Sequence, residues 1–348
     1  MTITLLDRHR GAAPQVDDDA TRRQFLAGLA ATGLFVACGS GDQPSATGPG
    51  DDPTWSFTDD RGVTVELPST PRRLAMQEDV AGALLSYGMR PTMVFGNAPI
   101  ADSPQFEGVG LDGIEEVGTS FGVINLERLA SLRPDVILVP WSASAPDDVT
   151  WMGFEDRAQA DQVASIAPLV AVNVTDLAYS DMMPRFQRLA EALGADTGTD
   201  AQRKMLESFE QARQAVRAAA AAAPDIKVMA VSPTPELMYI ARPARDNELR
   251  EYAALGVEIY SHAAAGEFEE VSWERMPERP ADVYLVDSRL GFVDLDFLAE
   301  HPIWTSLPAV QAGQVGRHFL GTVYRIPLVT ALLQELAELI SQAENLVA

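Results

Sequence analysis

The sequence predicts an α/β protein of two lobes that are joined by a single long helix. Residues 125–139 (NLERLASLRPDVILV) recur without a gap as residues 272–286 (SWERMPERPADVYLV). Each copy combines a short helix, a break marked by proline and a buried apolar strand, which indicates two similar lobes. Between the copies, a helical pattern of about 25 residues ends at Pro224, and a helix of that length spans ~37 Å, enough to cross between lobes.

The first lobe is expected at residues 54–180. It begins with a hairpin, because residues 54–67 alternate apolar and polar side chains around Asp60-Arg61-Gly62. Further strands are expected at 73–76, 92–95 and 169–172, a helix at 79–87, and a helix followed by a strand within 125–139. Alternating strands and helices of this kind favour a mostly parallel sheet.

Residues 181–223 are expected to be helical, with one break at Gly194. The last part of this segment carries apolar side chains at helical spacing, namely Met205, Phe209, Ala212 and Val216. Pro224 then ends the helix. An ordinary surface helix of one domain is the alternative, and the repeat on either side of the segment favours a lobe-spanning helix.

The second lobe is expected at residues 224–348, where the α/β rhythm resumes. Asp246 is a candidate N-cap and Gly256 a candidate stop for a helix at 247–255. Strands are expected at 227–231 and 237–240, the second copy of the repeat at 272–286, a turn at Gly313 before a short strand, and a final helix from Pro327 to about Leu346.

The charge of the chain argues against nucleic acid as a partner. The 348 residues are enough for two domains with sizeable cores. They include 26 basic and 50 acidic residues, which gives a net charge of −24. Nucleic-acid binding requires a basic surface. The acidity instead favours solubility and repulsion from other anions.

The first 37 residues are predicted to be a signal peptide. Residues 21–26 (TRRQFL), with Arg22-Arg23, are similar to a twin-arginine export signal. The apolar run that follows, from Leu26 to Ala37, is too short to cross a bilayer whose hydrocarbon core is ~30 Å thick. Such a run is typical of the hydrophobic part of a signal peptide.

Cys38 is predicted to carry a lipid. It is the only cysteine in the chain, and the preceding Phe35-Val36-Ala37 is similar to a lipobox, although Phe35 stands where leucine is usual. The alternative is an unpaired thiol in a cytosolic protein. Residues 38–53 are rich in Gly, Pro, Ser and Asp and are expected to form a flexible tether. The protein would then be extracytoplasmic and anchored to the cell membrane by its lipidated N-terminal cysteine.

Several segments of the sequence resemble those of the iron-siderophore and vitamin B12 type (class III) periplasmic substrate-binding proteins of ABC importers. They include residues 71–96 (PRRLAMQEDVAGALLSYGMRPTMVFG), 117–139, 268–286 and 303–315 (IWTSLPAVQAGQV), in the order and spacing of that family. The resemblance implies two Rossmann-like α/β lobes joined by one long helix, with a ligand cleft between them. It also implies that the protein captures a ferric siderophore and delivers it to an ABC permease. Vitamin B12 or haem is the alternative ligand within the family.

Glu127 and Glu274 occupy matching positions in the two copies of the repeat. Asn125 and Ser272 are suitable N-caps, so each glutamate falls in the first turn of its helix, where the helix dipole stabilises a carboxylate by ~0.3–1 kcal/mol. Stabilisation of its own helix is one explanation for the presence of a glutamate at each of these positions. The family resemblance implies another, in which one exposed glutamate on each lobe docks onto arginines of the permease.

The ligand site is expected beyond the carboxyl ends of the strands. Residues that follow expected strands are Gln77, Glu78, Gly96, Asn97, Trp141, Ser142, Arg242, Asp287, Ser288 and Arg289, and the pair Tyr324-Arg325 precedes the last helix. An aromatic face with arginines suits the apolar surface and anionic oxygens of a ferric siderophore. The predicted ligand-binding residues are Trp141, Arg242, Arg289, Tyr324 and Arg325. Surface salt bridges for the arginines and core packing for Trp141 are the alternatives.

The sequence gives little support to a metal site or an enzyme. His262, His301 and His318 lack the spacing of metal ligands, and the sequence contains no Gly-x-Ser-x-Gly or Walker motif. An exported α/β hydrolase using Ser288 is the alternative from another class, but Ser288 lacks a glycine-framed turn. We therefore expect a monomeric binding protein without catalytic residues, resident metal or cofactor.

Overall fold

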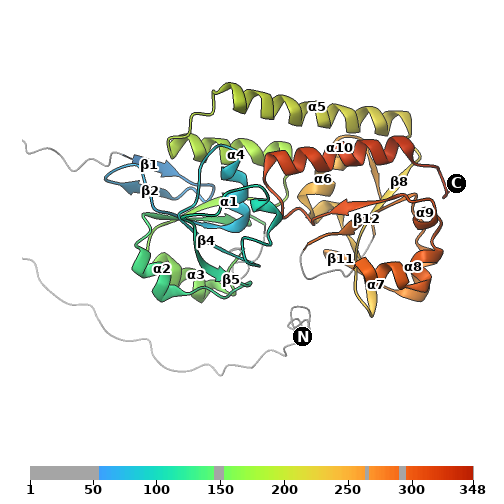
Figure 1. The fold of residues 1–348 in the computed structure, drawn as a ribbon, viewed down its shortest axis with the longest axis horizontal. Coiled ribbons are helices and arrows are strands. Elements are labelled where there is room, and N and C mark those ends of the chain that lie inside the picture. Colours follow the sequence, from blue (N-terminus) through green and yellow to red (C-terminus); the bar gives the residue numbers. More distant parts are fainter. Residues whose placement is uncertain (1–54, 145–152, 263–265, 290–294, 348) are drawn as a thin grey trace, which may run out of the picture. The chain divides into compact units, whose positions relative to one another are not determined.

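The computed structural model describes residues 55–144, 153–262, 266–289 and 295–347, shown in colour in Figure 1. The predicted signal peptide, Cys38 and the tether lie outside the described residues.

The first lobe is built on a parallel sheet of five strands in the order β5-β4-β3-β6-β7. The strands are β3 (Leu74–Gln77), β4 (Met93–Gly96), β5 (Glu115–Thr119), β6 (Val136–Trp141) and β7 (Leu169–Asn173). In the middle of the sheet, Met76 lies opposite Val94 on one side and Leu138 on the other. The strands other than the edge strand β5 are almost continuous apolar runs, because helices cover both faces of a parallel sheet.

Four helices and a hairpin surround this sheet. They are β1 (Trp55–Thr58), β2 (Thr64–Leu67), α1 (Glu78–Leu85), α2 (Leu126–Leu132), α3 (Arg157–Ala164) and α4 (Tyr179–Ala192), with a short 3-10 helix η1 (Pro104–Phe106). The antiparallel β1–β2 hairpin is the predicted one. Its turn passes through Gly62 at φ +79°, a conformation that glycine adopts without strain.

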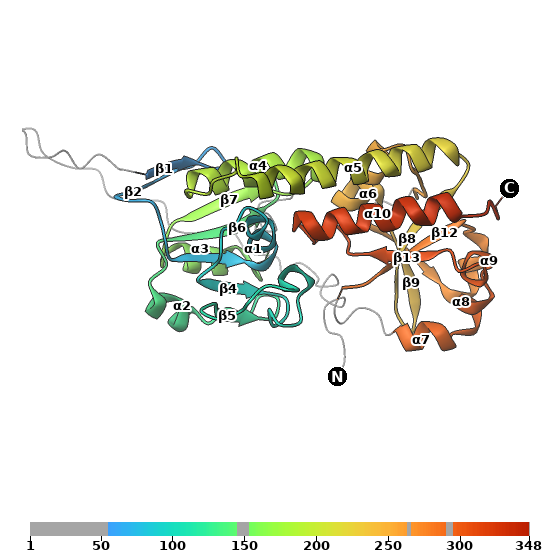
Figure 2. The same ribbon diagram turned by 45° about the horizontal axis from the view of Figure 1, so that its top comes forward.

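Helix α5 (Asp200–Ala222) links the two lobes, as predicted. Thr199 caps its start, and the break between α4 and α5 contains Gly194, which has φ +94°. Near its beginning, Gln202 Nε2 donates to Ser86 O of the first lobe, and further along Arg213 Nε donates to Glu251 Oε1 of the second. Helix α10 (Ile326–Gln342) packs beside it (Figure 2).

The second lobe has a mixed sheet of six strands. The main order is β11-β9-β8-β12-β13, and β10 pairs with β8. The strands are β8 (Lys227–Pro233), β9 (Leu237–Ala241), β10 (Glu258–Ile259), β11 (Phe268–Ser272), β12 (Val283–Asp287) and β13 (Val315–His318). The helices are η2 (Pro243–Arg245), α6 (Asn247–Ala254), η3 (Trp273–Glu278), α7 (Leu295–Glu300), α8 (Pro302–Ser306), α9 (Pro308–Gln311) and α10. Asp246 and Gly256 bound α6 as the sequence predicts.

The aspartate of each repeat ties together the beginnings of two neighbouring strands. In the first lobe Asp135 Oδ2 accepts a hydrogen bond from Arg73 N, and in the second Asp282 Oδ2 accepts one from Lys227 N, both at 2.8 Å. Asp135 precedes β6 and Asp282 precedes β12. In both copies of the repeat, the aspartate therefore holds two adjacent parallel strands in register.

Two details of the second lobe differ from the sequence prediction. The short helix predicted after Ser272 is the 3-10 helix η3, which contains Pro277, but Ser272, the predicted N-cap, makes no capping hydrogen bond to the backbone. The last helix ends at Gln342, short of Leu346. Beyond it, Leu346 N and Val347 N donate to Asp282 Oδ1, so the chain turns away to bond the sheet.

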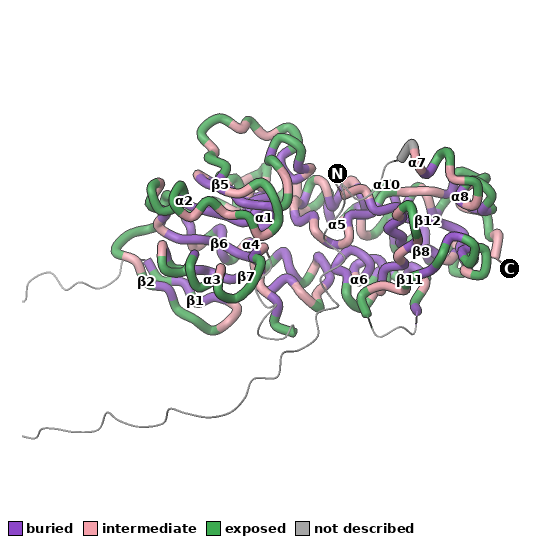
Figure 3. Tube along the Cα trace, turned by 90° about the horizontal axis from the view of Figure 1, so that it is seen from below, coloured by how far each residue is buried: buried purple, intermediate pink, exposed green. Residues whose placement is uncertain are grey.

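One apolar core runs through elements of both lobes. It joins β3, α1 and α4 of the first lobe to α5, β8, α6 and α10, with Phe186, Val216, Val228 and Leu333 among its buried side chains. Two smaller cores, one around Phe95 and one around Trp304, lie on the other sides of the sheets. Figure 3 shows central strands such as β6, β8 and β12 as mostly buried.

Replacing Asp282 with alanine is expected to lower the stability of the fold much more than the same change at Asp135. Asp282 is fully buried and accepts from three backbone N–H groups, which would lose a partner on its buried side. We expect Asp282→Ala to lower the free energy of unfolding by ~3 kcal/mol or more, and Asp135→Ala by ~1 kcal/mol, because Asp135 is partly exposed and water replaces it. Urea unfolding of both variants measures this. Equal losses would contradict the role of burial.

Candidate functional site

The carboxyl ends of strands from both sheets are connected through the side chain of Gln105. Its Nε2 donates to Asp79 Oδ1 at 3.2 Å, just after β3, and to Thr322 O at 2.9 Å, in the segment that follows β13. Its Oε1 accepts from Tyr324 N at 3.3 Å. We call these contacts, together with the hydrogen bond from Ile326 N to Ser86 Oγ at 2.9 Å, the lobe seam.

Two adjacent carboxyl groups lie on the first-lobe side of the seam. Glu78 and Asp79 begin α1, and Gln77 caps this helix by accepting from Asp79 N at 2.7 Å. Glu78 Oε2 accepts from Asn97 N at 3.0 Å. A Cβ at Gly96 would collide with Glu78 Oε2, so the close approach requires glycine there. Burial raises the pKa of Glu78 above its usual value.

Asp79 holds a proton more firmly than an ordinary aspartate. Burial and the charge of Glu78 raise its pKa to about 8, against the opposing effects of hydrogen bonds from Gln77 and Gln105 and of the positive charge of Arg289. Arg289 belongs to the second lobe, where it follows β12. The electrostatic contact of Asp79 with Arg289 therefore crosses from one sheet edge to the other.

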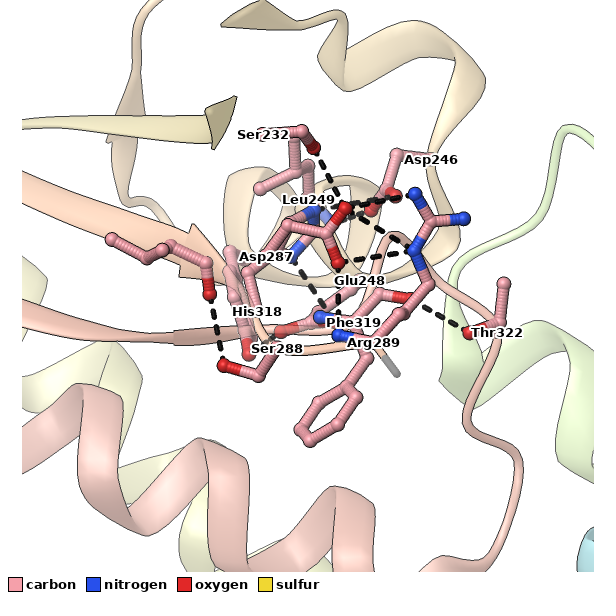
Figure 4. Close-up of polar contacts among 12 residues, drawn as sticks. Ser232, Asp246, Glu248, Leu249, Asp287, Ser288, Arg289, His318, Phe319 and Thr322 are labelled. Atoms are coloured by element: carbon pink, nitrogen blue, oxygen red, sulfur yellow. Dashed lines mark hydrogen bonds and ion pairs between the residues drawn. The ribbon is translucent and has the colours of Figure 1, made fainter. Parts of the chain in front are cut away.

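A buried histidine ends β13 on the second-lobe side (Figure 4). His318 has no exposed surface, and its Nδ1 lies 3.1 Å from Glu248 Oε2, while its Nε2 lies 3.6 Å from Asp246 Oδ2. Burial alone would lower the pKa of His318, but the charges of Glu248 and Asp246 outweigh it and raise the pKa to about 9. Glu248 also accepts from Phe319 N at 3.0 Å. This carboxylate thus fixes the start of the segment that leads into the seam.

Arg289 is held in place by the end of β12 (Figure 4). Its Nη2 and Nε donate to the two oxygens of the buried Asp287, at 2.8 Å and 3.0 Å. Ser232 Oγ donates to the same carboxylate at 2.8 Å. The side chain of Arg289 keeps 25% of its surface exposed. The guanidinium is therefore oriented in advance and still accessible.

Trp141 and Arg242 are only partly buried. Trp141 ends β6 and packs against the smaller first-lobe core, and its carbonyl accepts from Val174 N. Arg242 follows β9, and its backbone N–H donates to Glu267 O while its Nη1 donates to Gly266 O at 3.5 Å. Trp141 is the last residue of its strand and Arg242 directly follows its strand, so both lie at strand ends.

Tyr324 and Arg325 belong to the seam. Tyr324 is only 3% exposed and packs against Phe186, with ring centroids 5.9 Å apart. Arg325 Nη1 donates to Glu107 O at 2.5 Å and to Gln105 O at 3.4 Å. The structure gives both residues a role in joining the lobes, while their contact with ligand stays a prediction.

Both repeat glutamates have exposed side chains. Glu127 follows the N-cap Asn125, whose side chain accepts from Arg128 N, so its place in the first helical turn is as predicted. Glu274 lies at the start of η3, where hydrogen bonds from its own backbone and from Ser272 hold its pKa below the usual value. Docking of these carboxylates onto a permease stays a prediction.

The sequence analysis did not identify Asp79, Gln105, Glu248 or His318 as members of this region. Asp79 lies only two residues beyond β3, so a wider search after each strand end would have included it. Gln105 carries no such signal, because its partner Thr322 is 217 residues away in the sequence.

Within the described parts of the chain, no group of three or more His, Cys, Asp and Glu side chains is arranged to hold a metal ion. Among the same residues, no helix combines the length and the apolar character that crossing a membrane requires.

Comparison with protein families places this arrangement in a known class. Residues 114–317, more than half of the chain, match the model of the periplasmic binding protein family. The chain belongs to that family, which confirms the resemblance seen in the sequence.

Individual relatives cover most of the molecule. The crystal structure of DesE, a ferric-siderophore receptor protein from Streptomyces coelicolor, is 34% identical, covers 84% of this chain and 99% of its own, and superposes with a TM-score of 0.75. The Fe(3+)-citrate-binding protein YfmC of Bacillus subtilis is 23% identical over 265 residues, which are 74% of this chain and 76% of YfmC. The triscatecholate siderophore binding protein FeuA of Bacillus subtilis shares the fold, with 19% identity, a TM-score of 0.58, and coverage of 81% of this chain and 98% of FeuA.

The stability of the protein is expected to fall as the pH rises from about 6.5 to about 9. The pKa of His318 is about 9 when folded and 6.5 when exposed, so the folded state binds more protons in this window. The raised pKa of Asp79, about 8 against 3.8, acts in the same direction between those values. Thermal unfolding across this range checks the slope.

The variant His318→Gln should make this slope shallower, because it removes one of the two groups that titrate and leaves the contribution of Asp79. His301→Gln serves as the control, since it changes a partly exposed imidazole that is not in contact with Glu248 or Asp246. A wild-type stability that rises with pH through this window would contradict the assignment of the charged imidazole.

Proposed function

We propose that this protein is an extracytoplasmic receptor that captures a ferric siderophore and delivers it to an ABC permease for iron uptake. The observation that carries the proposal is the 34% identity to the ferric-siderophore receptor DesE over 99% of the length of DesE. The name of YfmC also specifies an iron(III) chelate. None of the relatives named above is described as a cobalamin or haem binder, so the ferric siderophore remains the favoured ligand.

The chemistry of the strand ends supports capture of an iron chelate. Arg289 presents an accessible guanidinium whose orientation is fixed by Asp287. A ferric siderophore offers anionic oxygens, which accept charge-assisted hydrogen bonds from such a group. Trp141 and Arg242 supply an aromatic surface and a second cation at other strand ends. The proposed ligand-binding residues are Trp141, Arg242, Arg289, Tyr324 and Arg325. Tyr324 and Arg325 also make contacts of the seam.

The remaining parts of the proposal concern delivery. Glu127 and Glu274, one exposed carboxylate in each lobe, would dock onto arginines of the permease. Cys38 would carry the lipid that anchors a monomer to the outer face of the cell membrane, after export directed by Arg22-Arg23. The protein would act by binding alone, without a catalytic step.

Loss of a site arginine is expected to weaken binding of the ferric siderophore. Purified protein is titrated with a panel of ferric siderophores, haem and cobalamin while its tryptophan fluorescence is followed. Arg289→Ala and Arg242→Ala should each weaken binding of the preferred complex by ~1–3 kcal/mol, because each removes a charge-assisted hydrogen bond.

The control for this titration is Arg157→Ala, which removes an exposed arginine paired with Asp161 on α3. It should bind with wild-type affinity. Binding of haem or cobalamin in preference to every ferric siderophore would overturn the proposal, and full affinity in both site variants would remove these arginines from the site.

The double variant Glu127→Ala/Glu274→Ala is expected to bind ligand normally and to fail in uptake. The exposed carboxylates contribute little to the fold, whereas the permease would lose a salt bridge at each lobe. Affinity is measured on the purified protein and iron uptake in cells that carry the variant as their only copy. Uptake at the wild-type rate would show that the glutamates serve only their helices.

A further inference from the structure

The strand ends around the seam contain more buried carboxyl groups than cations. Among the described residues there, five carboxyl groups belong to side chains that are at most 8% exposed, namely Glu78, Asp79, Asp246, Glu248 and Asp287. The cations that face them are His318, beside Glu248 and Asp246, and Arg289, beside Asp287. Arg325 adds a third cation, and its Nη1 donates to the backbone carbonyls of residues 105 and 107. Positive charge is therefore not in excess in this part of the molecule.

The charge of Arg289 is already balanced within the protein. Its Nη2 and Nε lie 2.8 Å and 3.0 Å from the two oxygens of Asp287, a residue with no exposed surface (Figure 4). The guanidinium also interacts electrostatically with Asp79 of the first lobe. A ligand oxygen that reaches Arg289 would gain a hydrogen bond there, but it would share the cation with a buried carboxylate.

The first-lobe side of the seam opposes additional negative charge. Glu78 and Asp79 are adjacent, and burial raises the pKa of each, to about 8 for Asp79. Glu78 Oε2 accepts from Asn97 N, and Asp79 accepts from the side chains of Gln77 and Gln105. A further anion beside this pair would be repelled by its charge, and a buried environment screens such repulsion poorly.

The segments that continue the chain beyond two of these strands bring no positive charge in their sequence. Residues 145–152 come after β6 and residues 290–294 after β12, and both segments lack Lys, Arg and His. They contain Asp147, Asp148 and Asp294. The net charge of the whole chain, −24, repels anions over longer distances as well. Local and overall charge thus act in the same direction.

We propose that this receptor selects a ferric complex without net negative charge, because its buried carboxylates leave no excess of positive charge for an anionic one. This inference rests on the proposed function. Three hydroxamate groups, each with a single negative charge, exactly balance iron(III), and their oxygens still accept hydrogen bonds from Arg289. Three catecholate groups leave a trianionic complex, which the strand ends would repel. Repulsion of the wrong ligand contributes to specificity as much as contacts with the right one.

The test presents one iron centre in three charge states. A linear ferric trihydroxamate with a terminal amine is cationic, its acetylated form is neutral, and its succinylated form is anionic. Their affinities for the purified protein are measured by tryptophan fluorescence at low ionic strength, together with those of a ferric tricatecholate and of ferric citrate. The cationic and neutral forms should bind about tenfold or more tightly than the tricatecholate, and the succinylated form more weakly than the acetylated one. Added salt should reduce these differences.

The variant Glu78→Gln tests whether the buried carboxylates cause this preference. It retains a side-chain oxygen that can accept from Asn97 N and removes one negative charge. It should strengthen binding of the anionic complexes by about threefold or more and change the affinity for the neutral complex by less than about twofold. The control Glu191→Gln removes an exposed carboxylate near the end of α4, where Trp55 Nε1 of the β1–β2 hairpin donates to Ala192 O. It should change neither affinity.

The possible results separate this inference from the proposed function. Binding of the tricatecholate or of ferric citrate as tightly as the neutral trihydroxamate would overturn the inference, while the protein would still be a receptor for iron(III) chelates. Preference for haem or cobalamin, or binding of no ferric complex, would overturn both. An unchanged preference in Glu78→Gln would overturn the role of the buried carboxylates. The comparison of complexes uses the wild-type protein and does not depend on the folding of this variant.

Discussion

The carboxamide of Gln105 is the contact on which the candidate site depends. It donates to Asp79 and to Thr322 O and accepts from Tyr324 N, so one neutral side chain satisfies polar groups on both lobes. Because buried polar groups without a partner cost ~1–3 kcal/mol each, separating these groups without solvating them would be unfavourable. The seam therefore ties the strand ends of the first sheet to the segment that follows β13.

Buried charge organises the second lobe around the same seam. The charged form of His318 compensates Glu248 and Asp246, and Arg289 compensates Asp287. Buried ion pairs of this kind add little net stability compared with apolar packing, but breaking one leaves an uncompensated charge. They also fix geometry, since Glu248 holds Phe319 N and Asp287 orients Arg289. Glu248 thus fixes the segment that leads into the seam, and Asp287 orients the cation of Arg289 for contact with a ligand.

The fold could be predicted largely from local patterns, and the site only in part. The repeat identified two lobes because each copy encodes a helix and a strand. Each copy also contains the aspartate that accepts a hydrogen bond from the beginning of the neighbouring strand. The short helix predicted after Ser272 is a 3-10 helix that contains Pro277, a residue without a backbone donor. Arg289 was found at the end of a strand, where ligand groups are expected, and its contact with a ligand stays a prediction. Gln105 was not predicted, because its role depends on contacts with residues more than 200 positions away. The same long-range contacts buried Tyr324 in the seam.

The central claim is that strand ends from both lobes hold a single ferric complex. The most direct measurement is the anomalous scattering of iron in crystals grown with the preferred ferric siderophore. The account places one iron between the end of β6, at Trp141, and the end of β12, near Arg289. An iron bound to one lobe alone, or at a surface away from these strand ends, would contradict it.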